Sequence, residues 1–384
     1  MTEKTRSRFI NDIYVNREYS WLLFDKRVLE QSQDLSNPLL ERCKFLSIFS
    51  SNLDEFFMVR VGSLYNESLS DAQARDNKTQ LTAAKQLEGV CETVRDLYAE
   101  RAVCYFRLKK ELSKYGVRIL RADELTPRQK EEARTVFMTH VLPLLSLMVL
   151  DAKHPLMQFE NMKNYMLYDL ERDGRHMVGV MAFNAALDRL YRIGGGEKAR
   201  LVPLEELVRA FGHNAFTGYT AGGRMMMRVT RNADFDTNID DSDVERDFSE
   251  IMKKKVESRA RLNVVRLEID REDEKLKEFV LKLLKLHPRF CFCDERFFDY
   301  KFMFSLDKYL PPERSLPLKY PPFKGAVAKE LCGAPSLIET VFRRDVFLSY
   351  PYDSMTPLVD LLEECAVDKR VTSVKITIYR LAHH

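Results

Sequence analysis

Apolar side chains near the start of the chain recur at helical spacing. Trp21, Phe24 and Val28 stand at i, i+3 and i+7, and this spacing predicts an amphipathic helix. Ser20 directly precedes the stripe and is expected to cap that helix, because a serine side chain accepts hydrogen bonds from the first backbone N–H groups.

Two more helices are predicted in the same region. Asn37 followed by Pro38 places a capping residue before a proline at the first helical position. A longer apolar stripe over 87–112 predicts a third helix, which Gly116 is expected to end. Packed side by side, these helices predict a helical bundle as the N-terminal domain, residues 1–116.

After residue 116 the apolar runs become shorter, and helix signals and strand signals are mixed. Thr126-Pro127-Arg128-Gln129 forms a capping box that opens a helix. Short apolar runs separated by glycine turns predict strands over 165–170, 177–183, 189–193, 225–230 and 264–269, with a charged helix over 244–261. Strands and helices in irregular order predict an α+β domain over residues 117–325.

A proline-rich stretch separates this domain from the next. Five prolines fall between 310 and 322, which predicts an extended, stiff connector. Beyond it, a strand over 345–350, a helix over 354–365 and a strand over 372–379 predict the βαβ opening of a parallel sheet over residues 326–384. Because such a sheet needs more strands and covered faces, the sequence is expected to stop inside this domain.

Composition narrows the class of protein. The 384 residues are 45% hydrophobic and 31% charged, with 61 basic against 58 acidic side chains. This balance is typical of a globular protein and argues against a uniformly basic nucleic-acid binder. No apolar run is long enough to span a bilayer, and nothing indicates peripheral membrane association. Seven scattered cysteines are typical of reduced thiols, and we expect a cytoplasmic protein.

Several weak sequence signals are best explained by local structure, without a catalytic or ligand-binding role. The residues Asp234, Asp236, Asn238, Asp240 and Glu245 follow calcium-loop spacing, but Ile239 stands where glycine is required. The basic residues of the 244–261 helix alternate with glutamates, as on a solvated face. The Gly194-Gly195-Gly196 run does not open a helix and is read as a turn. The sequence has no complete nucleophile motif.

Two residues are candidates for ligand contact. Asn52 lies in the polar segment 50–57, before two phenylalanines, and its amide offers a donor and an acceptor suited to an adenine or ribose edge. A cap or turn is the alternative explanation. Arg380 follows the predicted strand 372–379, at the edge where open α/β sheets bind ligands, and its guanidinium suits phosphate oxygens. An exposed arginine at a strand end is the alternative.

Blocks of sequence along the whole chain resemble polyphosphate kinases of the large type, whose catalytic half is phospholipase-D-like. They occur in order and comprise Tyr14-Val15-Asn16-Arg17-Glu18-Tyr19-Ser20-Trp21-Leu22, Ser51-Asn52-Leu53-Asp54-Glu55-Phe56, Arg228-Val229-Thr230-Arg231-Asn232-Ala233-Asp234 and Ile376-Thr377-Ile378-Tyr379-Arg380. The resemblance therefore extends from residue 14 to residue 380.

The resemblance implies both an architecture and a reaction. It implies a helical domain, a head domain used in dimer contacts, and phospholipase-D-like catalytic domains, the first of them incomplete here. The expected activity is reversible transfer of the terminal phosphate of ATP to inorganic polyphosphate through a phosphohistidine, with magnesium as cofactor. It further implies a homodimer or higher homo-oligomer. We expect no nucleic-acid partner, since a nucleic-acid binder would be supported by the basic helix over 244–261 alone. Asn52 is expected at the base side of ATP, and Arg380 at the phosphate and magnesium site without being a metal ligand.

The chain also departs from the family pattern. The catalytic histidines of the family are expected beyond Arg380, and His383 and His384 lack the H-x-K frame. We therefore expect the protein to be a polyphosphate kinase by family and residues 1–384 alone to be inactive. The alternative is a truncated paralogue that dimerises and binds nucleotide or polyphosphate without turnover.

Overall fold

The computed structural model describes residues 14–150, 158–196, 198–232, 262–271, 273–294 and 297–377. The chain divides into two compact units, Met1–Lys319 and Tyr320–His384, and each is described by itself. The calcium-like loop, the 244–261 helix and Arg380 all lie outside the described residues.

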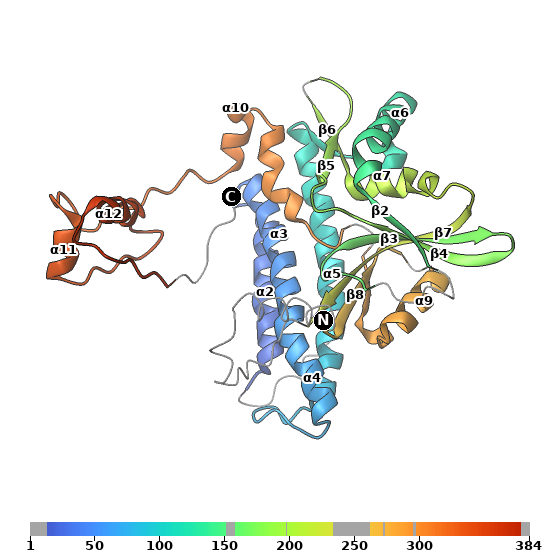
Figure 1. Ribbon diagram of the computed structural model, residues 1–384, viewed down its shortest axis with the longest axis horizontal. Helices are drawn as coiled ribbons and strands as arrows, with labels where there is room; N and C mark the ends of the chain where they lie inside the picture. Colours follow the sequence, from blue (N-terminus) through green and yellow to red (C-terminus); the bar gives the residue numbers. More distant parts are fainter. Residues whose placement is uncertain are drawn as a thin grey trace. The chain divides into compact units, whose positions relative to one another are not determined.

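The first unit begins with a layer of helices, α2 (Arg17–Gln33), α3 (Leu39–Phe56) and α5 (Ala83–Lys114), with α4 (Gly62–Ser70) at one end (Figure 1). A five-residue π-helical turn joins α3 to α4. The three predicted helices are confirmed in this layer, and Gly116 follows α5 with φ of 95°, a left-handed conformation that favours glycine.

Two predicted caps are wrong. The cap of α2 is Asn16, whose side chain accepts from the backbone N–H groups of Glu18 and Tyr19, so Ser20 lies inside the helix. The residue that caps α3 is Pro38, without a side-chain bond, and Asn37 instead donates to the Gln31 carbonyl. Both errors arise because the apolar stripe does not reveal how many polar residues precede it within the first turn.

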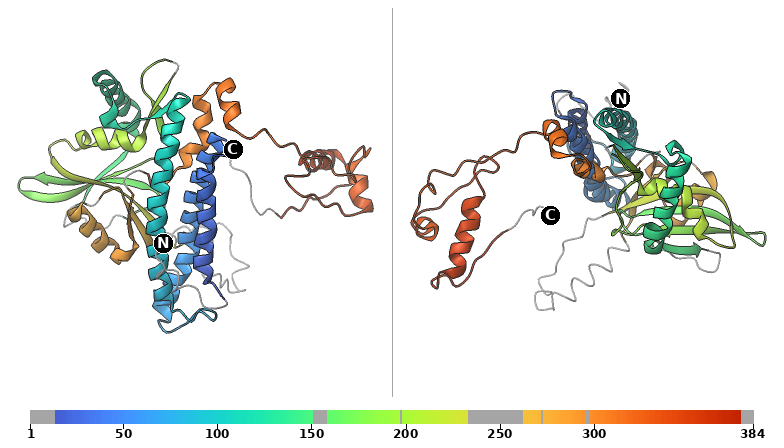
Figure 2. Two further views of the ribbon diagram at one scale, coloured as in Figure 1. Left: turned by 180° about the vertical axis from the view of Figure 1, so that it is seen from behind. Right: turned by 90° about the horizontal axis from the view of Figure 1, so that it is seen from above.

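The second layer of this unit is a six-stranded sheet in the order β2-β4-β3-β7-β8-β9. Its pairs are antiparallel except for β8 with β9. Figure 2 shows from behind and from above that the helices lie along one side of this sheet. The strands are β2 (Ser146–Leu150), β3 (Asn164–Arg172), β4 (Arg175–Ala182), β7 (Thr220–Arg231), β8 (Val264–Ile269) and β9 (Cys291–Cys293).

A three-stranded sheet in the order β1-β6-β5 completes the arrangement. Its strands are β1 (Val117–Ile119), β5 (Leu190–Arg192) and β6 (Ala199–Pro203). The predicted capping box at Thr126 and Gln129 is confirmed at the start of α6 (Pro127–Val136). Among the described residues of the first unit, the other α-helices of at least eight residues are α7 (Leu204–Phe211) and α9 (Glu274–Leu284).

One hydrophobic core joins the helices to the larger sheet. Leu22, Phe49 and Val94 from the helices belong to the same buried cluster as Met227 and Val265 from the strands. The mixed α and β architecture is therefore confirmed. The division at residue 116 stays a prediction, and the core runs across it without interruption.

The connector predicted at 310–322 is partly helical instead of extended. Pro312 opens a short helix, α10 (Pro312–Ser315), and a 3-10 turn follows at Leu316–Leu318. Proline is well tolerated in a first helical turn because its missing N–H would have no intrahelical partner there. Residues 319–325 then form neither a helix nor a strand.

The second unit contains α11 (Leu337–Arg343) and α12 (Thr356–Val367). The helix predicted over 354–365 is confirmed. The strands predicted over 345–350 and 372–379 are wrong as far as the described residues extend, because neither 345–350 nor 371–377 joins a ladder. The backbone pairing described for this unit is an isolated bridge between Ala326 and Asp353.

Candidate functional site

Asn52 lies near the C-terminal end of α3, on the side that faces α2. Its amide Nδ2 donates to Asp25 Oδ1 at 3.0 Å, and the side chain is half-buried. No second hydrogen bond to this amide comes from the residues that the structure describes. The amide oxygen and the second amide hydrogen are therefore available to a ligand.

Asp25 is the buried partner that holds this amide. Burial raises the pKa of Asp25 to about 7, although the hydrogen bond from Asn52 and the charge of Arg101 both lower it. Its second oxygen, Oδ2, has no hydrogen-bond partner among the described residues. A carboxylate removed from water in this way is costly to ionise.

Two aromatic rings stack beside the Asn52–Asp25 pair. Trp21 and Phe56 lie parallel, with ring centroids 4.4 Å apart and an interplanar angle of 13°. Trp21 is the one tryptophan of the sequence. Because it occupies the same helix as Asp25, one turn earlier, we expect its fluorescence to respond to a ligand at Asn52.

Asp54, two residues after Asn52, faces the opposite way into the protein. It accepts from Arg228 Nη2 at 2.9 Å and from Arg266. The same two arginines contact Glu268, with 2.7 Å between Arg228 Nη2 and Glu268 Oε2. Tyr98 closes the cluster by donating to Glu268 Oε1 at 2.7 Å. All five side chains are buried.

This buried cluster fixes the segment that carries Asn52. A buried charge is tolerated only when its partners are complete, and here two carboxylates face two guanidinium groups that also bond to Thr230 and to the Phe298 carbonyl. The cluster therefore locks the end of α3 onto strands β7 and β8, while Asn52 on the opposite face of the helix stays half-buried and accessible.

A second contact, between the start of α4 and the end of β7, depends on a glycine. The side chain of Asn232, directly after β7, lies so close to Gly62 that a Cβ at residue 62 would be 2.2 Å from Asn232 Oδ1. Asn232 also donates to the Gly62 carbonyl at 3.4 Å. Sequence reasoning missed Asp54, Arg228, Arg266 and Gly62, because a pattern of residue types does not show which distant side chains meet.

Metal binding finds no support in the described parts of the chain. No group of three or more His, Cys, Asp and Glu side chains comes together there as a cation site. Likewise, none of the helices in these ranges is long and apolar enough to cross a membrane. Arg380, the other predicted site residue, is not among the described residues, and its position relative to Asn52 stays a prediction.

Comparison with protein families gives a consistent result along the chain. Residues 14–120 match the polyphosphate kinase N-terminal domain, residues 128–306 the polyphosphate kinase middle domain, and residues 336–384 the polyphosphate kinase C-terminal domain 1. The N-terminal, middle and C-terminal domain models therefore match successive parts of the chain, in that order.

Individual relatives agree with the family models. The chain is 33% identical over 382 residues to a polyphosphate kinase from Bacillus cereus, covering 96% of this chain and 53% of that protein. It is 31% identical over 385 residues to a polyphosphate kinase from an Exiguobacterium species, covering 98% and 52%. The chain thus spans about half the length of the curated relatives it matches.

A solved structure shares the fold. The crystal structure of polyphosphate kinase from Porphyromonas gingivalis superimposes with a TM-score of 0.70 at 22% identity, covering 92% of this chain and 49% of that one. At this identity the likeness concerns the arrangement of helices and strands alone.

Proposed function

The chain belongs to the polyphosphate kinase family, and from this premise we propose that the protein transfers the terminal phosphate of ATP reversibly to inorganic polyphosphate, with residues 1–384 supplying part of the nucleotide site. The observation that carries the proposal is the Asn52 amide, held by buried Asp25 at 3.0 Å on a helix end that two buried arginines lock in place.

In this proposal Asn52 reads the adenine base. Asp25 occupies one amide hydrogen, so Asn52 presents its carbonyl oxygen together with the other hydrogen. That pair is complementary to the amino group and an adjacent ring nitrogen of adenine, as in the bidentate contacts that asparagine makes with this base. Asp25 acts as a positioning residue, because its hydrogen bond determines which way the Asn52 amide is turned.

We propose that the phosphate groups and the phosphohistidine are handled elsewhere. Arg380 would bind phosphate oxygens, for which its planar guanidinium is suited. No histidine of the sequence is followed two residues later by lysine, so we place the reactive histidine outside residues 1–384. When bound, magnesium would neutralise phosphate charge, but we assign it no ligand among the described residues.

We also propose that the protein is a homodimer or a higher homo-oligomer through its middle region. Strand β2 forms one edge of the six-stranded sheet, and Leu147 and Met148 on it are exposed. An apolar edge strand favours pairing with another chain. Sedimentation velocity on wild type and Leu147→Lys tests this proposal: we expect a dimer that the lysine weakens, and a wild-type monomer at micromolar concentration would contradict it.

Titration with ATP, followed through Trp21 fluorescence, tests the nucleotide site. We expect Asn52→Ala to weaken binding about tenfold, since two hydrogen bonds of about 0.5–1.5 kcal/mol each are lost. Asn66→Ala is the matched control, because Asn66 is an exposed asparagine on α4. Equal ATP affinity of Asn52→Ala and wild type would contradict the proposed site.

Phosphate transfer needs a separate assay. With radiolabelled ATP, residues 1–384 are expected to bind nucleotide without forming polyphosphate. Polyphosphate synthesis by these residues would show that the reactive group lies within them, and would overturn our placement of the histidine.

A further inference from the structure

A pocket of about 450 Å³ opens beside the C-terminal part of α5. Its walls come from α5, β1, the turn at Ala122–Glu124, the start of α7 and the segment at Phe297. This volume lies within the range of about 300–1,000 Å³ that is usual for small-molecule sites. The pocket thus joins the helical layer to the smaller sheet.

The pocket is separate from the site at Asn52. None of its lining residues belongs to α2 or α3. Lys26, the residue after Asp25, contacts Glu100 of α5 at 3.0 Å. Asp25 therefore lies beside α5 near residue 100. Lys109 lies about nine residues further along that helix, or roughly 14 Å at 1.5 Å per residue.

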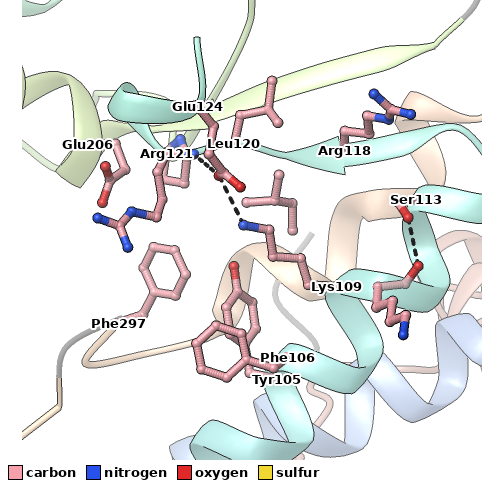
Figure 3. Close-up of a pocket in the computed structure, with 13 residues that line it drawn as sticks. Tyr105, Phe106, Lys109, Ser113, Arg118, Leu120, Arg121, Glu124, Glu206 and Phe297 are labelled. Atoms are coloured by element: carbon pink, nitrogen blue, oxygen red, sulfur yellow. Dashed lines mark hydrogen bonds and ion pairs between the residues drawn. The ribbon is translucent and has the colours of Figure 1, made fainter.

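One side of the pocket is aromatic. Tyr105 and Phe106 come from α5, and Phe297 lies beside them (Figure 3). The Tyr105 and Phe297 rings meet edge to face with centroids 5.4 Å apart. Phe106 is 43% exposed, so part of its ring is open to a ligand. Such rings provide a stacking surface for a planar heterocycle.

The remaining lining is rich in positive charge. Four basic side chains line the pocket against two carboxylates, a surplus of two positive charges. Both carboxylates already have partners: Lys109 lies 3.2 Å from Glu124, and Glu206 pairs with Arg209. Lys110 and Arg118 form no ion pair with any carboxylate in the described parts of the chain, and both are exposed. They are therefore available to an anion.

A planar stacking surface beside unpaired cations fits one ligand class. We propose that this pocket is a second nucleotide site, with the base against Phe106 and the phosphates at Lys110 and Arg118. A bare phosphate chain would leave the aromatic wall unused, and an uncharged aromatic compound would leave the two cations unused. A nucleotide satisfies both because it carries a base at one end and anionic oxygens at the other.

Photolabelling with 8-azido-ADP tests this proposal on the whole chain. Mass spectrometry of the digested protein is expected to locate label in the segment 105–121, and excess ADP is expected to prevent it. Mapping by peptide separates this site from Asn52, so the outcome does not depend on the site proposed above. Absence of label from 105–121 in the wild-type protein would overturn the proposal.

Variants then identify the groups that bind. The double change Lys110→Ala with Arg118→Ala is expected to reduce labelling of 105–121 at least tenfold. Arg107→Ala with Lys114→Ala is the matched control, since it removes two exposed basic residues of α5 that do not line the pocket. Equal loss of labelling in both double variants would show that labelling depends on positive charge in general and not on Lys110 and Arg118. That result would contradict the proposal.

The contribution of the base is tested by competition. ADP is expected to protect the segment from labelling at concentrations about tenfold below those of inorganic pyrophosphate, and Phe106→Ala is expected to remove most of that advantage. Equal protection by pyrophosphate and ADP in the wild-type protein would show a simple anion site and overturn the nucleotide assignment.

Discussion

Strand β7 in the first unit and the segment 371–377 in the second carry comparable patterns of strand-forming residues. In β7, Met225, Met227 and Val229 are fully buried, and the strand pairs with β3 on one side and β8 on the other. In the second unit, Val374 and Ile376 are 51% and 59% exposed, and 371–377 joins no ladder. A β pattern therefore forms a strand only where neighbouring strands and a packing surface exist to receive it.

Hydrogen exchange should show the largest difference between the two segments. Amides of β7 are expected to exchange at least about 10⁴-fold more slowly than in an unstructured peptide, because a core strand opens with a free energy of about 5 kcal/mol or more. Amides of 371–377 should exchange within about tenfold of the unstructured rate. Equal protection in the two segments, measured by mass spectrometry, would mean that 371–377 is paired in solution.

The next largest effect should come from the buried charges behind β7. Arg228→Met removes one guanidinium from Asp54 and Glu268, so it leaves an uncompensated negative charge in the core. We expect a loss of about 3–5 kcal/mol in the free energy of unfolding, measured with urea. Arg121→Met is the control, because Arg121 contacts Asp123 at 2.8 Å with both side chains exposed, 48% and 64%, where a pair contributes about 0–1 kcal/mol. Similar losses in both variants would contradict this account.

The pH dependence of stability should reveal Asp25. Its pKa is raised from 3.8 to about 7 by burial, so between these values the folded state holds a proton that the unfolded state has released. Stability should therefore fall as pH rises, by about 2–3 kcal/mol from pH 5 to pH 8, and level off above the folded pKa. Asp25→Asn should abolish this component. An unchanged slope in the variant would show that Asp25 is not the titrating group.

The smallest structural effect is expected at Gly62. A methyl group there would be 2.2 Å from Asn232 Oδ1, so the Asn232 side chain has to move and β7 loses a contact with the helices. We expect Gly62→Ala to lower the free energy of unfolding by about 1–2 kcal/mol, after allowing for the better helix propensity of alanine. Gly195→Ala, which meets nothing within 4 Å, should be neutral. A neutral Gly62→Ala would contradict the proposed fit.

Much of the fold was predictable because its signals are local. The stripe over 87–112, the capping box at Thr126 and the strand at Val264–Ile269 each depend on residues close together in the sequence. The core that α2, α3 and α5 share with the larger sheet was not predictable in this way. It depends on contacts such as that of Asp54 with Arg228, 174 residues apart, for which the sequence contains no short-range signal.

The candidate site could likewise be predicted only in part from the sequence. Asn52 could be selected from its residue type and its neighbours, and the resemblance to polyphosphate kinases gave it an expected role. Asp25 could not be selected, because an aspartate in an amphipathic helix is ordinarily read as a solvated residue. Only the packing of α2 against α3 shows that this carboxyl group is buried and holds the Asn52 amide.

A comparison of ATP with inosine triphosphate, followed through Trp21 fluorescence, would test the role of Asn52 in base recognition. The two nucleotides differ at position 6 of the base, where inosine has an oxygen in place of the amino group, with an accompanying ring proton. The wild-type chain is predicted to bind ATP about tenfold more tightly than inosine triphosphate, and Asn52→Ala to bind the two alike. If Asn52→Ala kept the wild-type preference, the Asn52 amide would not be reading the base, and the proposed site would be wrong.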